Sequence, residues 1–129
     1  MTKKELSQLY NLSKEIKAKE EQLEQLKAIA ESTTAQLSDM PHGSRVSDKI
    51  GKTVAEIADI KALIQLKIQE YWHEYNRLTR YINDIDDSLV RRIMELRHIK
   101  GMKWNAVADV IGTNENAVKQ TYSRYLRSH

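Results

Sequence analysis

Apolar residues recur at alternating steps of three and four through the first part of the chain. The series consists of Leu9, Leu12, Ile16, Lys19, Leu23, Leu26, Ala30, Thr33 and Leu37. This heptad spacing predicts one long helix with a single apolar face. Thr2 and Glu5 have the spacing of a capping box, which predicts that the helix begins there. The helix should end near Leu37, because a cluster of Pro, Gly and Ser residues follows in the loop 38–47.

A second apolar series predicts a second long helix, from about Asp48 to Asn83, with Ser47 or Asp48 as its cap. Ten of its eleven positions are apolar or aromatic, the series being Ile50, Val54, Ile57, Lys61, Ile64, Ile68, Tyr71, Tyr75, Leu78, Ile82 and Ile85. Two long helices joined by a short loop form an antiparallel hairpin. Residues 1–83 are therefore predicted to be a coiled-coil-like helical hairpin, in which Leu26 faces Ile57 and Ile16 faces Ile68. The second helix outlasts the first, so its end should pack on the segment that follows.

Three shorter amphipathic segments are predicted in residues 84–129. The first should begin at the acidic cluster Asp84, Asp86 and Asp87 and end at Gly101, with an apolar face of Leu89, Ile93, Leu96 and Ile99. The second contains Trp104, Val107, Ala108 and Ile111 and ends at Gly112. The third should have Thr113 as its N-cap and bury Val118, Tyr122 and Leu126. The fold class predicted for the whole chain is all-α.

The spacing of Ala108, Gly112 and Val118 is typical of a helix-turn-helix. That motif needs a small residue where its helices cross and an aliphatic residue where the second helix enters the core. It also needs a glycine in the turn, because the backbone there takes a positive φ. We therefore predict that residues 84–129 form a three-helix DNA-binding module.

A resemblance to known proteins points in the same direction. The stretch from Ile93 to Leu126 resembles region 4 of bacterial sigma factors, through Leu96, Arg97, Gly101, Trp104, Val107, Ala108, Gly112, Thr113, Val118, Arg124 and Leu126. The whole chain is similar to a family of small phage and prophage proteins of Gram-positive bacteria, some of them late-gene transcription regulators. The stretches 40–50 (MPHGSRVSDKI) and 80–104 (RYINDIDDSLVRRIMELRHIKGMKW) carry that similarity. In the present chain His98 replaces the family's usual aromatic residue, and Lys103 stands where a serine cap is common.

The second helix of a helix-turn-helix enters the major groove with its N-terminal half facing the bases. This places Asn114, Glu115, Asn116, Lys119 and Gln120 near base edges, where each has a fitting hydrogen-bond pattern. Farther along the helix, Ser123, Arg124 and Arg127 are expected to meet phosphate. The alternative is that these eight residues are ordinary solvent-facing polar residues of a terminal helix, and DNA contact is favoured over it for Lys119 and Gln120. The preceding helix carries four basic residues that either add phosphate contacts or pair with nearby acids: Arg91, Arg92, Arg97 and Lys100. Trp104 is favoured as a core residue over a stacking platform.

Composition narrows the functional classes. The formal net charge of +3 is a weak signal for a nucleic-acid partner, and cysteine is absent, which removes disulfides and thiolate chemistry. No apolar run approaches the roughly 20 residues of a membrane span, and no signal peptide is evident, so we expect no membrane partner and a bacterial cytoplasmic location. The histidines His42, His73, His98 and His129 lack metal-ligand spacing. We expect neither an enzyme nor a bound cofactor or metal.

The leading functional hypothesis is a phage or prophage transcription regulator that binds double-stranded DNA, with or without a contact to RNA polymerase. A phage packaging protein resembling a small terminase subunit is an alternative, although the order of its parts would be reversed. A structural helical adaptor is another. Off the main apolar series, Ile60, Leu63, Leu66 and Trp72 form extra apolar surface. That surface is either a wider core face covered by the C-terminal helices or a surface for homodimer formation.

Overall fold

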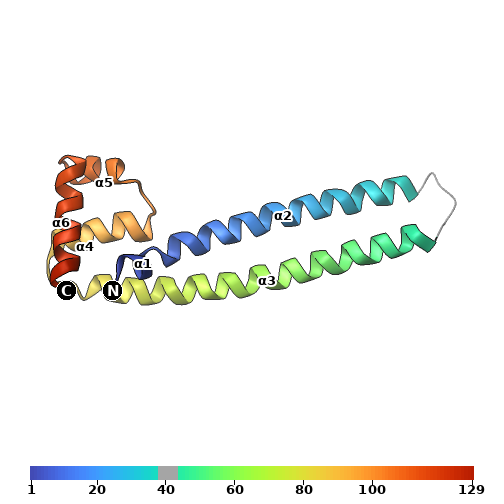
Figure 1. The fold of residues 1–129 in the computed structure, drawn as a ribbon, viewed down its shortest axis with the longest axis horizontal. Coiled ribbons are helices and arrows are strands. Elements are labelled where there is room, and N and C mark those ends of the chain that lie inside the picture. The colour runs from blue at the N-terminus through green and yellow to red at the C-terminus, as the bar shows by residue number, and fades with distance from the viewer. Residues whose placement is uncertain (38–43) are drawn as a thin grey trace. The chain divides into compact units, whose positions relative to one another are not determined.

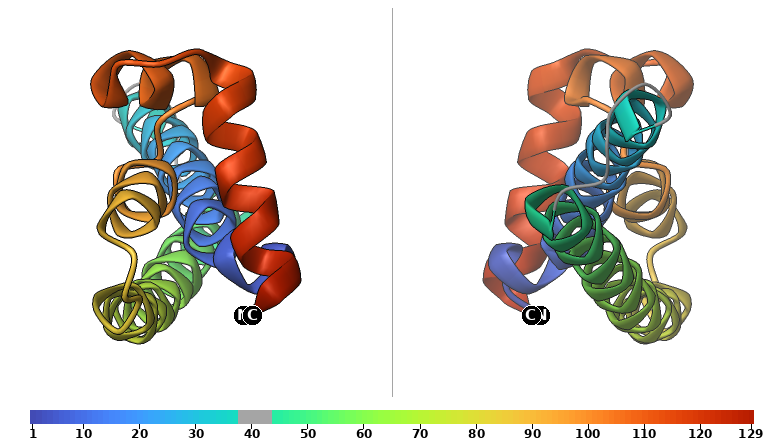
Figure 2. Two further views of the ribbon diagram at one scale, coloured as in Figure 1. Left: turned by 90° about the vertical axis from the view of Figure 1, so that its left-hand side faces the viewer. Right: turned by 90° about the vertical axis from the view of Figure 1, so that its right-hand side faces the viewer.

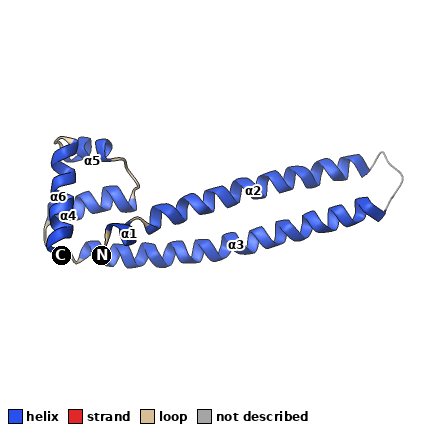
Figure 3. Ribbon diagram, in the orientation of Figure 1, coloured by secondary structure: helices blue, strands red, loops and turns tan. Residues whose placement is uncertain are grey.

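The computed structural model describes residues 1–37 and 44–129, and all regular secondary structure in these ranges is helical (Figure 3). Along the chain the elements are α1 (Lys3–Leu6), α2 (Gln8–Leu37), α3 (Ser44–Asn83), α4 (Ser88–Met94), a π-helical turn (Glu95–Ile99), α5 (Trp104–Ile111) and α6 (Glu115–Ser128). Figure 1 labels the α-helices. The all-α prediction is confirmed for the described residues. No helix within them is both long and apolar enough to span a bilayer.

Most of the predicted helix ends agree with the structure. Thr2 is the N-cap of α1, and its hydroxyl accepts a hydrogen bond from the Glu5 N–H at 3.2 Å. Ser7 separates α1 from α2, a break that the heptad pattern did not predict. Helix α3 begins at Ser44, earlier than the predicted start at Ser47 or Asp48. Most of the predicted loop 38–47 lies outside the described residues.

Packing divides the chain into two compact units, which are described separately. One consists of Lys14–Gln69, and the other combines Met1–Ser13 with Glu70–His129. The first turns of the chain and the last turns of α3 share a core with the C-terminal helices, so this unit includes residues from both sides of the boundary predicted at residue 83.

In the unit Lys14–Gln69, helices α2 and α3 run side by side in opposite directions (Figure 1). An ion pair between Lys67 Nζ and Glu15 Oε2, at 2.5 Å, joins them in the register expected from the pairing of Ile16 with Ile68. The predicted apolar face of α2 is confirmed within this unit. Its members from Ile16 to Ala30 are all partly buried.

The predicted apolar face of α3 needs a correction in its first half. Val54 is 56 % exposed and Lys61 is exposed, whereas Thr53 is buried and Ile60 is partly buried. The contacting series is therefore Ile50, Thr53, Ile57, Ile60 and Ile64, at steps of three and four. The predicted series has steps of three and four as well, so the heptad period does not distinguish the two faces. Burial shows that the covered face of α3 is rotated toward Thr53 and Ile60.

The second unit has one continuous core. It consists of Leu6, Leu9, Leu78, Ile82, Ile85, Val90, Ile93, Met94, Leu96, Val107, Ala108, Val118 and Tyr122. The end of α3 packs on the C-terminal helices, as expected from its greater length. Arg77 of α3 also pairs with Glu5 of α1, with 2.7 Å between Nη2 and Oε2. The two chain ends lie close together in this unit (Figure 2).

Helix α4 begins as predicted, and the predicted apolar face is buried at Ile93 and Leu96, partly buried at Ile99 and wrong at Leu89. The Asp87 side chain caps it by accepting from the N–H groups of Leu89 and Val90. Leu89, expected in the core, is 40 % exposed, and Val90 is buried in its place. Gly101 ends the segment with φ +68°, as the sequence predicted.

Candidate nucleic-acid interface

The turn between α5 and α6 is built around one carbonyl. The Ala108 oxygen accepts from both Gly112 N–H, at 2.8 Å, and Thr113 N–H, at 3.0 Å. Gly112 has φ +89°, a left-handed conformation that disfavours side chains with a Cβ. Ala108 is 3 % exposed and Val118 is 1 % exposed, so both helices enter the core beside this turn. The glycine, the small residue and the aliphatic residue thus have the local positions that their spacing predicted.

The N-cap of α6 is Asn114, so the prediction of Thr113 was wrong. The Asn114 side chain accepts a hydrogen bond from the Ala117 N–H at 2.8 Å. Thr113 donates its own N–H back to α5, and this bond makes it the last residue of the turn. Asn114 has extended backbone, the conformation that an N-cap requires.

The remaining predicted contact residues fall on identifiable faces of α6. Asn116, Gln120 and Arg127 are exposed and Ser123 is partly buried. Their spacing of four, three and four places them in one strip along the helix, on the side away from the buried Val118 and Tyr122. This set is called the polar strip below.

Three other predicted residues lie outside the polar strip. Lys119 and Glu115 form an exposed ion pair, with 2.8 Å between Nζ and Oε1. Exposed pairs of this kind contribute little stability, so both side chains can exchange their partner for a ligand at low cost. Arg124 is exposed on the flank of α6 opposite to Lys119.

Two of the arginines before α5 have structural roles that the sequence did not indicate. Arg91 Nη1 donates to the carbonyl oxygens of Ile85, at 2.6 Å, and Asp86, at 3.2 Å. Arg97 Nη1 donates to the Met102 carbonyl at 2.9 Å. These side chains therefore bind backbone carbonyls of the neighbouring turns, and neither is paired with a carboxylate in these bonds. Arg92 and Lys100 are exposed.

Trp104 lies against the core, as predicted. It is partly buried, and its ring meets the Tyr122 ring edge-on with 4.9 Å between centroids. The Trp104 ring makes a second contact with Arg97, whose guanidinium carbon lies 4.8 Å from the ring centroid. Trp104 thus links the π-helical turn to α6 through a cation–π contact with Arg97 and an aromatic contact with Tyr122.

His98 is a buried group that the sequence did not assign to the core. It is 7 % exposed, and its Nε2 lies 2.9 Å from the Tyr122 hydroxyl. The segment Glu95–Ile99 is π-helical, with Lys100 N–H bonded to the Glu95 carbonyl at 3.0 Å. The wider π turn inserts one residue into the helical period, which accounts for His98 facing inward beside Leu96.

The described residues contain no group of histidine, cysteine or carboxylate side chains arranged to hold a metal ion. From Arg97 to the last residue there are two acidic residues, Asp109 and Glu115. The lysines and arginines of this segment are Arg97, Lys100, Lys103, Lys119, Arg124 and Arg127. The local balance around α5 and α6 is therefore more basic than the net charge of the chain suggested.

The chain was compared with models of protein families, with curated proteins and with solved structures, and none of these comparisons found a match.

Proposed function

We propose that the chain is a sequence-specific DNA-binding protein in which α5 and α6 form a helix-turn-helix and α6 enters the major groove. The observation that carries the proposal is the polar strip of α6, defined above. It offers two amides, a hydroxyl and a guanidinium on one helix face, next to a glycine turn of the kind that this motif uses. The surrounding excess of basic residues adds the electrostatic attraction that phosphate requires.

Each contact residue has a role that follows from its place on α6. Asn116 and Gln120 face outward near the first turns of the helix, where an amide can bond adenine in a bidentate manner. Lys119 lies at the edge of the strip and is suited to guanine, once it leaves Glu115. Asn114 acts on DNA through the helix that it caps, because its side-chain oxygen is already engaged.

The end of α6 is assigned to the DNA backbone. Ser123, Arg124 and Arg127 lie farther from the start of the helix and carry groups that bind phosphate oxygens. Contacts of this kind set affinity and position, and they do not discriminate sequence. Apart from Glu115, which pairs with Lys119, the predicted residues thus divide into base-reading, capping and backbone-binding groups.

The resemblance to sigma region 4 and to small phage and prophage proteins supports a role in transcription. We propose that the protein is a phage or prophage regulator that acts at a promoter in the bacterial cytoplasm. Genome-wide mapping of its binding in the host tests this role. Enrichment at a promoter is the expected result, and enrichment at a DNA-packaging site would contradict it in favour of a terminase-like function.

DNA binding itself is tested by selecting duplexes from a random library and measuring affinity by fluorescence anisotropy. We expect a preferred sequence to emerge. We also expect affinity for it to fall as salt rises, with a slope of log affinity against log salt of about −1 for each neutralised phosphate. An unenriched library, or an affinity that does not change with salt, would contradict the proposal.

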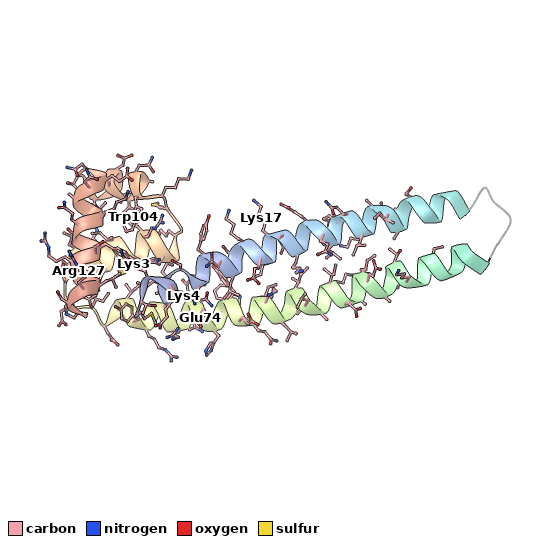
Figure 4. The ribbon with its side chains drawn as sticks, in the orientation of Figure 1. Lys3, Lys4, Lys17, Glu74, Trp104 and Arg127 are labelled. Carbon is pink, nitrogen blue, oxygen red and sulfur yellow. The ribbon has the colours of Figure 1, made fainter. Side chains whose placement is uncertain are left out.

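Two variants separate the assigned roles. Gln120→Ala should weaken binding to the selected duplex by about 1–3 kcal/mol and leave a scrambled duplex nearly unaffected. Arg127→Ala should weaken both duplexes alike and reduce the salt slope by about one unit. Lys17→Ala is the matched control, since it removes an exposed charge of α2 (Figure 4) and should leave both affinities unchanged. Equal losses on both duplexes for Gln120→Ala would move that residue to a backbone role.

A further inference from the structure

A cavity of about 250 Å³ lies where α1, the π-helical turn, α5 and α6 meet, within the second unit. Its lining consists of Lys3, Ser7, Arg97, His98, Trp104, Lys119, Tyr122 and Ser123. Among these residues are three with cationic side chains and none with a carboxylate. Lys3 and Ser7 come from the start of the chain and were not singled out in the sequence.

Two of the three cations stand over the aromatic wall of the cavity. Trp104 and Tyr122 form that wall as an edge-on pair with centroids 4.9 Å apart. The Arg97 guanidinium carbon lies 4.8 Å from the Trp104 centroid, and Lys3 Nζ lies 5.9 Å from the Tyr122 centroid. Figure 4 labels Lys3 and Trp104, both close to α6. Cations held on ring faces keep their N–H groups free to point at a ligand.

The hydrogen-bonding capacity of these groups is only partly used. Arg97 donates one N–H to the Met102 carbonyl, and a guanidinium has five. Lys119 is engaged with Glu115 in an exposed pair, which a stronger anion can displace. The hydroxyl of Ser123 lines the same cavity.

The positive charge of Arg97 affects the pKa values of two cavity residues, His98 and Tyr122. Burial is the main cause that lowers the pKa of His98 to about 4, and the charge of Arg97 lowers that pKa further. The same charge opposes the rise in the pKa of Tyr122 that burial produces. His98 is therefore neutral at pH 7, and the fixed charges of the cavity are the three cations.

We propose that this cavity binds one phosphate group, held by Lys3, Arg97 and Lys119. A tetrahedral phosphate anion matches a set of cations that line one cavity and include the planar fork of an arginine. The volume accommodates a phosphate with part of the molecule that carries it. Two sources share this chemistry: a small phosphorylated molecule and the phosphodiester backbone of DNA. Lys119 belongs both to the cavity and to the predicted DNA-contacting residues, so occupation of the cavity by a small molecule would alter DNA binding.

The test uses the full chain without DNA, so its result does not depend on the proposed DNA binding. Sodium phosphate is titrated at constant ionic strength against a chloride reference, and the indole N–H signals of the two tryptophans are followed by NMR. Trp104 lines the cavity, whereas Trp72 is 53 % exposed on α3 and serves as the internal reference. We expect the Trp104 signal to shift to saturation with phosphate while Trp72 barely moves.

Lys3→Ala and Lys4→Ala form the matched pair of variants. Both remove one charge near the start of the chain, but only Lys3 lines the cavity. Lys3→Ala should weaken phosphate binding by roughly threefold to tenfold, as expected for an exposed charged hydrogen bond, and Lys4→Ala should leave it unchanged. A Trp104 signal that responds no more than in chloride overturns the proposal. Equal weakening by the two variants also overturns it, since the response would then reflect general charge.

Two further titrations distinguish the sources. Adenosine monophosphate binding more tightly than inorganic phosphate would identify a small phosphorylated molecule as the occupant. A duplex that shifts the Trp104 signal in the wild type and not in Lys3→Ala would identify the DNA backbone. If neither adenosine monophosphate nor the duplex shifts the Trp104 signal, the proposal fails, even when inorganic phosphate shifts that signal.

Discussion

At the scale of single residues, His98 is a titratable side chain that the fold removes almost completely from water. It is 7 % exposed and hydrogen-bonded through Nε2 to the Tyr122 hydroxyl. Burial, followed by the nearby charge of Arg97, lowers the pKa of His98 to about 4. Protonation of this imidazole in the folded state would bury a charge beside another positive charge. The neutral form therefore belongs to the native structure.

The buried histidine predicts that stability declines in mild acid. An unfolded histidine titrates near pH 6.5, so between pH 6.5 and about 4 the unfolded chain binds the proton more readily. The stability present above pH 6.5 is therefore lost as the pH falls toward 4. From pH 7 to pH 5 the free energy of unfolding should fall by about 2 kcal/mol, at roughly 1.4 kcal/mol per pKa unit. Urea unfolding at the two pH values measures this difference.

The control for this prediction is His98→Gln, which keeps a hydrogen-bonding group near Tyr122 and does not titrate. Its free energy of unfolding should differ little between pH 7 and pH 5, whatever its absolute value. If His98→Gln loses as much stability as the wild type over this range, the acid sensitivity has another origin. The window above pH 5 limits the contribution of carboxylates, whose ordinary pKa values lie lower.

The cap of α6 gives a second prediction at this scale. Asn114→Ala removes the acceptor for the Ala117 N–H and should cost about 1 kcal/mol of stability. Thr113→Ala alters the neighbouring exposed side chain and should cost much less, because the bond that Thr113 makes to Ala108 uses its backbone N–H. Urea unfolding of both variants tests the assignment. A larger loss for Thr113→Ala would restore Thr113 as the cap.

At the scale of elements, the turn between α5 and α6 depends on the backbone of Gly112. Its φ is +89°, and a Cβ built there would meet nothing within 4 Å. Substitution is therefore opposed by backbone strain and not by a clash. Gly112→Ala should cost about 1–2 kcal/mol of stability, and Gly112→Val should cost more because its side chain is β-branched. Both variants should weaken DNA binding, since relaxation of the strain changes the angle between α5 and α6.

Gly51→Ala is the matched control for the turn. Gly51 lies within α3, and its added Cβ would also meet nothing within 4 Å. In a helix interior the same change should raise stability by about 0.5–1 kcal/mol. Circular dichroism should remain helical for all three variants. Normal DNA affinity and stability in Gly112→Val would mean that this turn does not fix the two helices.

The elements show where sequence patterns are sufficient and where they fail. Helix ends marked by a cap or a glycine, such as Thr2, Asp87 and Gly112, were predicted from local chemistry and agree with the structure. The face of α3 was misjudged at Val54, because an adjacent series with the same steps of three and four is the buried one. The burial of His98 was not predictable, since it follows from a π turn that no residue in the sequence marks.

The candidate site was predictable only in part, for a related reason. The polar strip of α6 follows from helical periodicity, which local sequence contains. The nearness of Lys3 to Tyr122, by contrast, depends on tertiary packing between the two ends of the chain. The structural use of Arg97 likewise depends on where the Met102 carbonyl falls after Gly101. Contacts between residues distant in sequence are set by the shared core, and a single sequence does not reveal them.

At the scale of the whole molecule, self-association is the property that bears most on DNA recognition. Of the residues proposed as extra apolar surface, Leu63, Leu66 and Trp72 remain 37 %, 57 % and 53 % exposed. They are therefore not core residues of a wider covered face. Ile60 is the exception, because it belongs to the series that contacts α2. Leu63 and Leu66 lie about 60° apart around α3, whereas Trp72 lies on the side opposite to Leu63, so of these three only Leu63 and Leu66 can form one apolar patch for another chain.

We expect the wild-type chain to form a dimer through this part of α3, and a dimer would present two copies of α6 to two half-sites. Leu66→Glu should yield a folded monomer, because a charge at an exposed position costs the fold little but opposes apolar association. Its DNA binding should fall by at least tenfold through the loss of the second contact. Gln65→Glu adds the same charge at the neighbouring exposed position and should remain dimeric. Sedimentation equilibrium decides the matter: a wild type that sediments as a single 15.0 kDa chain at micromolar concentration excludes dimer formation in the absence of DNA.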